Sequence, residues 1–187
     1  MSNRTKNYSA FYVAEPFSPS NLGAHATKDF CYYNTLRMWK GEDASFPFVN
    51  AHDATYSVRD GSDWEKTLKP RLRERLRVSK NIILFLSKNT ESSDALREEI
   101  EYGIGTLGLP VIVIYPDYKS KSDLLDENGN LKEEVKKLWN NLPEFRDLMS
   151  SVPTLHIAMN KETIRKALNE KSFSVQHKCI NDVYIYR

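Results

Sequence analysis

Glu99 is the residue whose type and position in this sequence best suit chemistry. It lies in the segment Asp94–Leu107, which follows the apolar run Ile82–Leu86 and precedes a second apolar run, Val111–Tyr115. This order predicts a β-α-β unit with Glu99 in the first turns of its helix. The start of such a helix lies at the carboxyl edge of a parallel sheet, where open α/β folds bind ligands. The sequence therefore predicts a carboxylate fixed beside a ligand-binding edge.

The spacing of this predicted helix separates three neighbouring glutamates, Glu98, Glu99 and Glu101. An apolar stripe marks the buried face of the helix and consists of Leu96, Ile100, Ile104 and Leu107. At about 100° per residue, Glu98 points nearly opposite this stripe and is expected in solvent. Glu99 and Glu101 lie on the two flanks, and Glu99 is the nearer to the helix start. An alternative interpretation is that Glu98 and Glu99 only interact favourably with the helix dipole.

Two aromatic residues, Phe11 and Tyr12, come near the end of the first predicted strand, Tyr8–Val13. A proline-containing loop follows and leaves the carboxyl edge of the sheet, so either ring could stack on an aromatic ligand. Packing of both side chains in the core is an equally good interpretation.

Three polar residues, Asn50, His52 and Asp53, follow the segment Phe46–Val49. This segment is expected to be an edge or ragged strand, because Pro47 cannot donate to a ladder of hydrogen bonds. The three polar side chains could bind ribose or phosphate; alternatively, Asp53 caps a turn and His52 is solvated. No cysteine or second histidine lies nearby in the sequence, so no metal site is predicted.

Strands that alternate with helices predict an α/β fold with a flavodoxin-like, mostly parallel, five-stranded sheet flanked by helices. Further helices are expected over residues 27–40, 64–78, 131–142, 143–150 and 161–169, and further strands over 153–159 and 183–186. A chain of 187 residues is expected to form a single domain over 1–187, with a core of about 8–170 and a C-terminal tail of 171–187.

The composition excludes several classes of protein. A net charge of +2 gives no global field that would favour nucleic acid. The two cysteines, Cys31 and Cys179, match no metal or redox spacing and are expected to be reduced thiols. No apolar stretch approaches the roughly 20 residues needed to cross a bilayer. We therefore expect a cytoplasmic protein.

Seven basic residues crowd the predicted helix that precedes Ile82. They are Lys66, Lys69, Arg71, Arg73, Arg75, Arg77 and Lys80. They could form a nucleic-acid patch, a contact surface for another protein or a solvated face. We favour the last two, because the whole chain is nearly neutral and no aromatic residues interleave for base stacking.

The sequence resembles the Toll/interleukin-1 receptor (TIR)-like family of the ThsB proteins of bacterial Thoeris anti-phage systems. Four stretches within roughly residues 8–116 carry the resemblance: YSAFYVAEPF, RMWKGEDASFPFVNAHD, GSDWEKTLKPRLRERLRVSKNIILFLSKNT and ALREEIEYGIGTLGLPVIVIYP. The C-terminal stretch NNLPEFRDLMSSVPTLHIAMNKETIRKAL is also similar to that family.

The resemblance implies cleavage of NAD+ between nicotinamide and ribose, with Glu99 at the position of the family's catalytic glutamate. The ADP-ribose part would become a cyclic or conjugated signal that activates a separate effector, after a phage component triggers the enzyme. NAD+ would be a substrate, with no prosthetic group, and the loop after the first strand would line its pocket. Phe11 and Tyr12 beside this loop, and Asn50, His52 and Asp53 after the second segment, are the candidate pocket residues. TIR domains generally act by assembling, so self-assembly is expected. Two alternatives stay open, a non-catalytic TIR-type scaffold and, less favoured, a nucleic-acid-binding protein.

Overall fold

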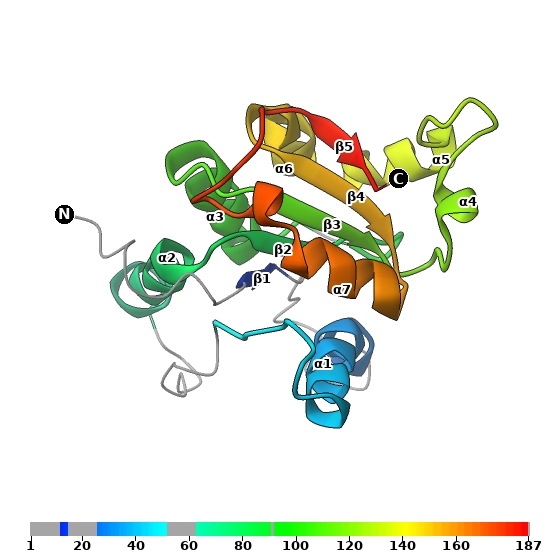
Figure 1. Ribbon diagram of the computed structural model, residues 1–187. Helices are drawn as coiled ribbons and strands as arrows, with labels where there is room; N and C mark the ends of the chain where they lie inside the picture. The colour runs from blue at the N-terminus through cyan, green and yellow to red at the C-terminus, as the bar shows by residue number, and fades with distance from the viewer. Residues whose placement is uncertain (1–11, 15–25, 52–62, 91, 187) are drawn as a thin grey trace.

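A five-stranded parallel sheet forms the centre of the computed structural model, which describes residues 12–14, 26–51, 63–90 and 92–186 (Figure 1). Its strands are β1 (Tyr12–Ala14), β2 (Ile82–Phe85), β3 (Val111–Tyr115), β4 (Thr154–Ala158) and β5 (Val183–Ile185). They lie in the sheet in chain order, and each neighbouring pair is parallel. The predicted α/β fold with a parallel sheet is confirmed.

Seven α-helices connect these strands in the described part of the chain. They are α1 (Ala26–Glu42), α2 (Lys69–Val78), α3 (Asp94–Ile100), α4 (Lys121–Leu124), α5 (Glu133–Lys137), α6 (Pro143–Leu148) and α7 (Lys161–Asn169). Two π-helical turns, η2 (Trp64–Leu68) and η3 (Glu101–Thr106), extend α2 at its start and α3 at its end. Short 3-10 turns are η4 (Leu138–Asn141), η5 (Met149–Ser151) and η6 (Lys171–Phe173). None of the helices in the described ranges is both long and apolar enough to cross a membrane.

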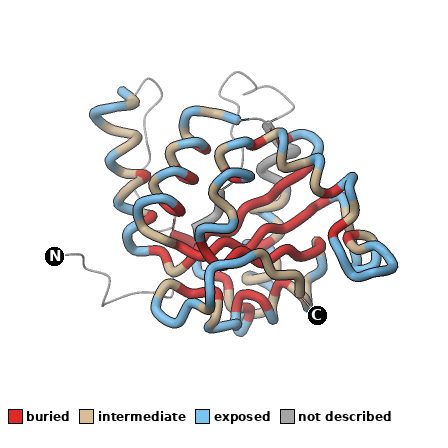
Figure 2. Tube along the Cα trace, turned by 90° about the horizontal axis from the view of Figure 1, so that it is seen from above, coloured by how far each residue is buried: buried red, intermediate tan, exposed pale blue. Residues whose placement is uncertain are grey.

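Two apolar layers cover the two faces of the sheet. Successive residues of a strand point to opposite faces, so Ile82 and Leu84 enter one layer while Ile83 and Phe85 enter the other. Residues of α2, α3 and α6 complete the first layer, and residues of α1 and α7 complete the second. Figure 2 shows the buried strands enclosed by helices whose outer sides are exposed. Burial on both faces explains why the central strands are almost uniformly apolar.

The segment Phe46–Val49 is not a strand, contrary to the sequence-based expectation. Phe46 and Phe48 are buried in the second layer, where Phe46 packs edge-on against Trp39 of α1. The aromatic residues therefore serve to cover a face of the sheet. The fifth strand is β5, within the segment expected to be a C-terminal tail.

Pro70 is accommodated by the start of α2. The α-helical part begins at Lys69, directly after the π-helical turn Trp64–Leu68, so the winding changes next to the proline, which has no backbone N–H to donate. The preceding π-helical turn is capped by Asp63, whose side chain accepts a hydrogen bond of 2.7 Å from the amide of Lys66. The helix expected over 64–78 thus consists of a π-helical turn, Trp64–Leu68, followed by the α-helix Lys69–Val78.

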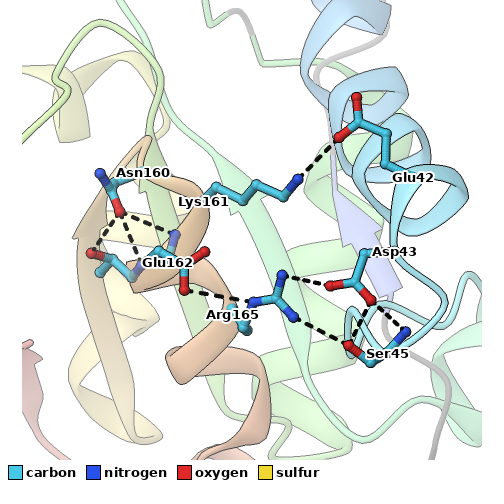
Figure 3. A network of polar contacts seen from close by, with 8 residues as sticks. Glu42, Asp43, Ser45, Asn160, Lys161, Glu162 and Arg165 are labelled. Carbon is cyan, nitrogen blue, oxygen red and sulfur yellow. Dashed lines mark hydrogen bonds and ion pairs between the residues drawn. The ribbon is translucent and has the colours of Figure 1, made fainter.

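A polar clamp joins the end of α1 to α7 on the second face (Figure 3). Arg165 of α7 reaches Asp43 with Nη2 2.8 Å from Oδ2, and its guanidinium lies 5.3 Å from the ring centre of Phe46. Lys161 pairs with Glu42 at 3.0 Å. The clamp connects parts of the chain that are more than a hundred residues apart, so α1 is held by the C-terminal part.

Candidate active site

The turn after β2 delivers the chain to the start of α3. The amide of Ser87 donates to Oγ1 of Thr90 at 2.9 Å, and the amide of Thr90 donates to the carbonyl of Ser87 at 3.1 Å. Ser93 then caps α3, because its side chain accepts a hydrogen bond from the amide of Leu96 at 3.2 Å. The helix therefore begins at the carboxyl end of β2, as the sequence predicts.

Glu99 is buried within α3, with 8 % of its surface exposed. Its neighbours on the helix, Leu96 and Ile100, are each 1 % exposed, whereas Glu101 is exposed. A glutamate is rarely removed from water in this way, because burial costs the ionised carboxylate its hydration. Burial distinguishes Glu99 from the acidic residue on the opposite flank, which the spacing alone could not do.

Glu98 does not point into solvent, and the sequence-based expectation for it is wrong. Its side chain is 12 % exposed, and Nε of Arg73 donates to its Oε1 at 2.6 Å. Nζ of Lys69 lies 3.6 Å from the other carboxylate oxygen. The helical spacing placed Glu98 away from the sheet correctly, but α2 packs along this flank of α3 and covers it.

The helix changes its winding two residues after Glu99. The π-helical turn η3 begins at Glu101, one residue after Ile100. Gly103 within this turn lies so close to the sheet that a Cβ atom there would be 2.6 Å from Cδ1 of Ile82. Such π-helical turns are frequent at functional sites. The glycine thus allows α3 and η3 to approach β2 closely.

Asn50 is the other predicted site residue whose side chain the structure describes. It is 7 % exposed, and its Nδ2 donates a hydrogen bond to the hydroxyl of Tyr33 in α1. Phe48 belongs to the second apolar layer, whereas Ala51 belongs to the first, together with Leu96. The chain thus passes from one layer to the other at Asn50. Sequence reasoning missed Tyr33, because no local pattern links it to Asn50, which lies 17 residues away.

The remaining predicted site residues are not placed by the structure. Phe11, His52 and Asp53 lie outside the described residues. Tyr12 is the first residue of β1, opposite Ile82 in β2, but its side chain also lies outside the described part. These four residues stay predictions.

A buried polar group in β4 was also missed. His156 is fully buried, and its Nδ1 lies 2.7 Å from the hydroxyl of Tyr115, which accepts a hydrogen bond of 2.8 Å from Trp139. Burial lowers the pKa of His156 from 6.5 to about 3 and raises the pKa of Tyr115. A histidine within the apolar run PTLHIAM was the only sequence signal for this group. A neutral imidazole in such a site is suited to a structural role.

Within the ranges that the structure describes, no group of three histidine, cysteine, aspartate or glutamate side chains could hold a metal ion. The carboxylate of Glu99 in α3 is the buried acidic group that the candidate site shows.

Comparison with known proteins adds two findings. Residues 8–121 match the family model described as "Thoeris protein ThsB, TIR-like domain", which covers more than half of the chain. A solved structure titled as a conserved protein from Enterococcus faecalis V583 has a similar fold, with a TM-score of 0.50 and 13 % sequence identity. The similarity covers 86 % of this chain and 96 % of that chain. At this identity it supports the fold alone.

Proposed function

Because the chain belongs to the family of TIR-like domains of the Thoeris protein ThsB, a component of anti-phage defence, we propose that it cleaves NAD+. The reaction breaks the bond between nicotinamide and ribose, and the ADP-ribose part becomes a cyclic or conjugated signal. The observation that carries the proposal is the burial of Glu99 in the helix that follows β2. NAD+ is the substrate, and the chemistry requires neither a prosthetic group nor a metal ion.

The chemistry of this bond explains why one carboxylate suffices. The nicotinamide ring of NAD+ carries a positive charge and leaves as a neutral molecule, taking the electron pair of the bond, so no general acid has to protonate it. Positive charge develops on the ribose, as in the cleavage of a glycosidic bond. A fixed carboxylate beside the ribose stabilises this charge, and it does so more strongly where water is excluded. The 8 % exposure of Glu99 fits that role.

The fate of the ribose cation determines the product. Attack by water on C1′ gives ADP-ribose and releases one proton. Attack by another nucleophile, either on the same ADP-ribose or on a second molecule, gives a cyclic or a conjugated product and likewise releases a proton. We propose that the site limits access of water, so that a signalling product forms.

The partners follow from membership of a defence system. We propose that a phage component triggers the enzyme and that the diffusible nucleotide, rather than direct contact, activates the effector. Self-assembly of the domain is expected, as for TIR domains in general.

The test is to incubate the purified protein with NAD+, with and without phage lysate, and to identify the products by chromatography and mass spectrometry. We expect nicotinamide together with a cyclic or conjugated ADP-ribose derivative, formed faster in the presence of lysate. If folded protein with lysate leaves NAD+ intact, the proposal is wrong, and the non-catalytic scaffold becomes the better description.

A further inference from the structure

Two charged residues directly before Glu99 fasten α3 to two different helices. On one side, Glu98 accepts a hydrogen bond of 2.6 Å from Nε of Arg73 in α2. On the other side, Nε of Arg97 donates to Oε1 of Glu144 in α6 at 2.9 Å. The side chains of Glu98 and Glu144 are 12 % and 20 % exposed, whereas the side chains of Arg73 and Arg97 are 38 % and 48 % exposed, so only the acidic partner of each pair is largely covered.

A second contact lies one helical turn farther along the interface with α2. The ring of Tyr102 is covered by Arg73, whose guanidinium carbon lies 4.6 Å from the ring centre. The hydroxyl of the same tyrosine accepts a hydrogen bond of 2.8 Å from Nε of Arg77. Glu98 and Tyr102 are four residues apart, as are Arg73 and Arg77, so the two pairs interlock along neighbouring helices. The interface thus resists sliding of α3 along α2.

Arg97, Glu98 and Glu99 are consecutive, so their side chains leave the helix about 100° apart. A roll of α3 about its axis would move Arg97 relative to α6 and Glu98 relative to α2 at the same time. With a side-chain radius of roughly 6 Å, a roll of about 20° would displace a carboxylate by about 2 Å. A displacement of about 1 Å in a reacting group can cost about a hundredfold in rate.

We propose that Arg97 and Glu98 are positioning residues, which brace α3 against α6 and α2 so that Glu99 faces the ribose. This inference rests on the proposed NAD+ cleavage and adds residues to it. The braces act through the orientation of the helix and do not touch the substrate. They also explain why much of the basic charge of α2 faces α3.

The test compares the steady-state kinetics of Glu98→Gln and Arg97→Gln with those of the native protein, all with phage lysate and NAD+. We expect kcat to fall about tenfold or more while KM changes by less than about twofold, because geometry in the transition state is lost rather than substrate binding. A looser site also admits water, so the fraction of free ADP-ribose among the products should rise. Glu101→Gln is the matched control, because this exposed glutamate lies on the same helical segment and should leave kinetics and products unchanged.

A double variant in which Glu98 and Arg73 exchange their charges tests whether the ion pair itself is needed. Expressing the rates per folded molecule separates loss of orientation from loss of fold. The double variant Glu98→Arg with Arg73→Glu restores an ion pair across the same interface, so we expect it to recover at least half of the kcat lost in Glu98→Arg alone. The rates are expressed per folded molecule, with the folded fraction taken from circular dichroism and thermal unfolding.

The outcomes distinguish the two proposals. If Glu99→Gln abolishes turnover while Glu98→Gln and Arg97→Gln keep the native kcat and product ratio, the braces do not position Glu99 and this inference is wrong. If neither the native protein nor Glu99→Gln consumes NAD+, the proposed function itself fails, and the inference fails with it. If both consume NAD+ equally, NAD+ cleavage stands but Glu99 is not the residue that carries it, and the inference fails with that assignment.

Discussion

His156 lies fully buried in β4, among the rings of Tyr115, Trp139 and Phe145. Since Trp139 already donates to the oxygen of Tyr115, the tyrosine hydroxyl can donate its own proton to Nδ1. Of the two ring nitrogens, Nε2 is buried and has no hydrogen-bond partner among the described residues. Protonation would place a positive charge on a side chain that is removed from water, which is why burial lowers the pKa of His156 to about 3.

This lowered pKa predicts a pH-dependent loss of stability. Between the unfolded value of 6.5 and the folded value of about 3, only the unfolded chain binds the proton at His156, so acid favours unfolding. As the pH is lowered through this interval, we expect the free energy of unfolding of the native protein, relative to that of His156→Phe, to fall by about 1.4 kcal/mol for each pH unit. Urea unfolding of both proteins at several pH values measures the difference. A constant difference would mean that His156 is not kept neutral by the fold.

The sequence placed Glu99 correctly in the helix that follows β2, but it did not show the surroundings of Glu98. Helical spacing describes one helix at a time, so it showed which side of α3 faces the sheet and not that α2 covers another flank. The partner of Asn50 was inaccessible for a similar reason, because Tyr33 lies 17 residues away in another element. Contacts between elements depend on packing, which no local pattern contains.

At the level of elements, the close approach of η3 to β2 predicts a difference between two glycines. In Gly103→Ala the new methyl group would lie 2.6 Å from Cδ1 of Ile82, a side chain that is itself 1 % exposed. Overpacking of this kind costs about 1–3 kcal/mol, which outweighs the gain of about 0.5–1 kcal/mol from replacing a helical glycine. We expect a net loss of about 1 kcal/mol in the free energy of unfolding.

Gly105→Ala is the matched control, because nothing lies within 4 Å of the position where its Cβ would be. Here only the helical preference acts, so we expect unchanged or slightly higher stability. Chemical denaturation of the two variants beside the native protein tests both expectations. Equal stability of the two variants would show that η3 does not press on the sheet at Gly103.

Elements with strong local signals were predicted closely. The strand β3 has the expected bounds, Val111–Tyr115, because Pro110 and Pro116 flank an apolar run. The helix α7 also has its expected bounds, and the side chain of Asn160 caps it by accepting from the amides of Glu162 and Thr163.

Phe46–Val49 was mistaken for a strand because aromatic residues at every second position suit both a strand and an extended segment that packs on a sheet. Only a neighbouring strand that forms hydrogen bonds with the segment would make it a strand, and the segment's own sequence does not show whether such a neighbour is present. In the folded protein, Phe46 and Phe48 pack in the same apolar layer as residues of α1 and α7.

For the whole molecule, we predict weak binding to nucleic acid, because several basic residues of α2 contact the neighbouring helix. Lys69 and Arg73 face Glu98, and Arg77 faces Tyr102, so these charges hold α2 to α3. The chain as a whole carries a net charge of only +2. Fluorescence anisotropy with labelled DNA and RNA should show at most weak, non-specific binding at physiological salt. Tight binding with a steep dependence on salt would contradict this account and favour a nucleic-acid-binding protein.

The central claim is that the carboxylate of Glu99 stabilises the ribose cation during cleavage of NAD+. The most direct measurement compares release of nicotinamide by the native protein, Glu99→Gln and Glu101→Gln, at equal folded concentration and with the same phage lysate. Glutamine keeps nearly the same shape but lacks the charge, so we expect Glu99→Gln to lose about a hundredfold or more of the rate while Glu101→Gln keeps it. Native release of nicotinamide by folded Glu99→Gln would contradict the claim.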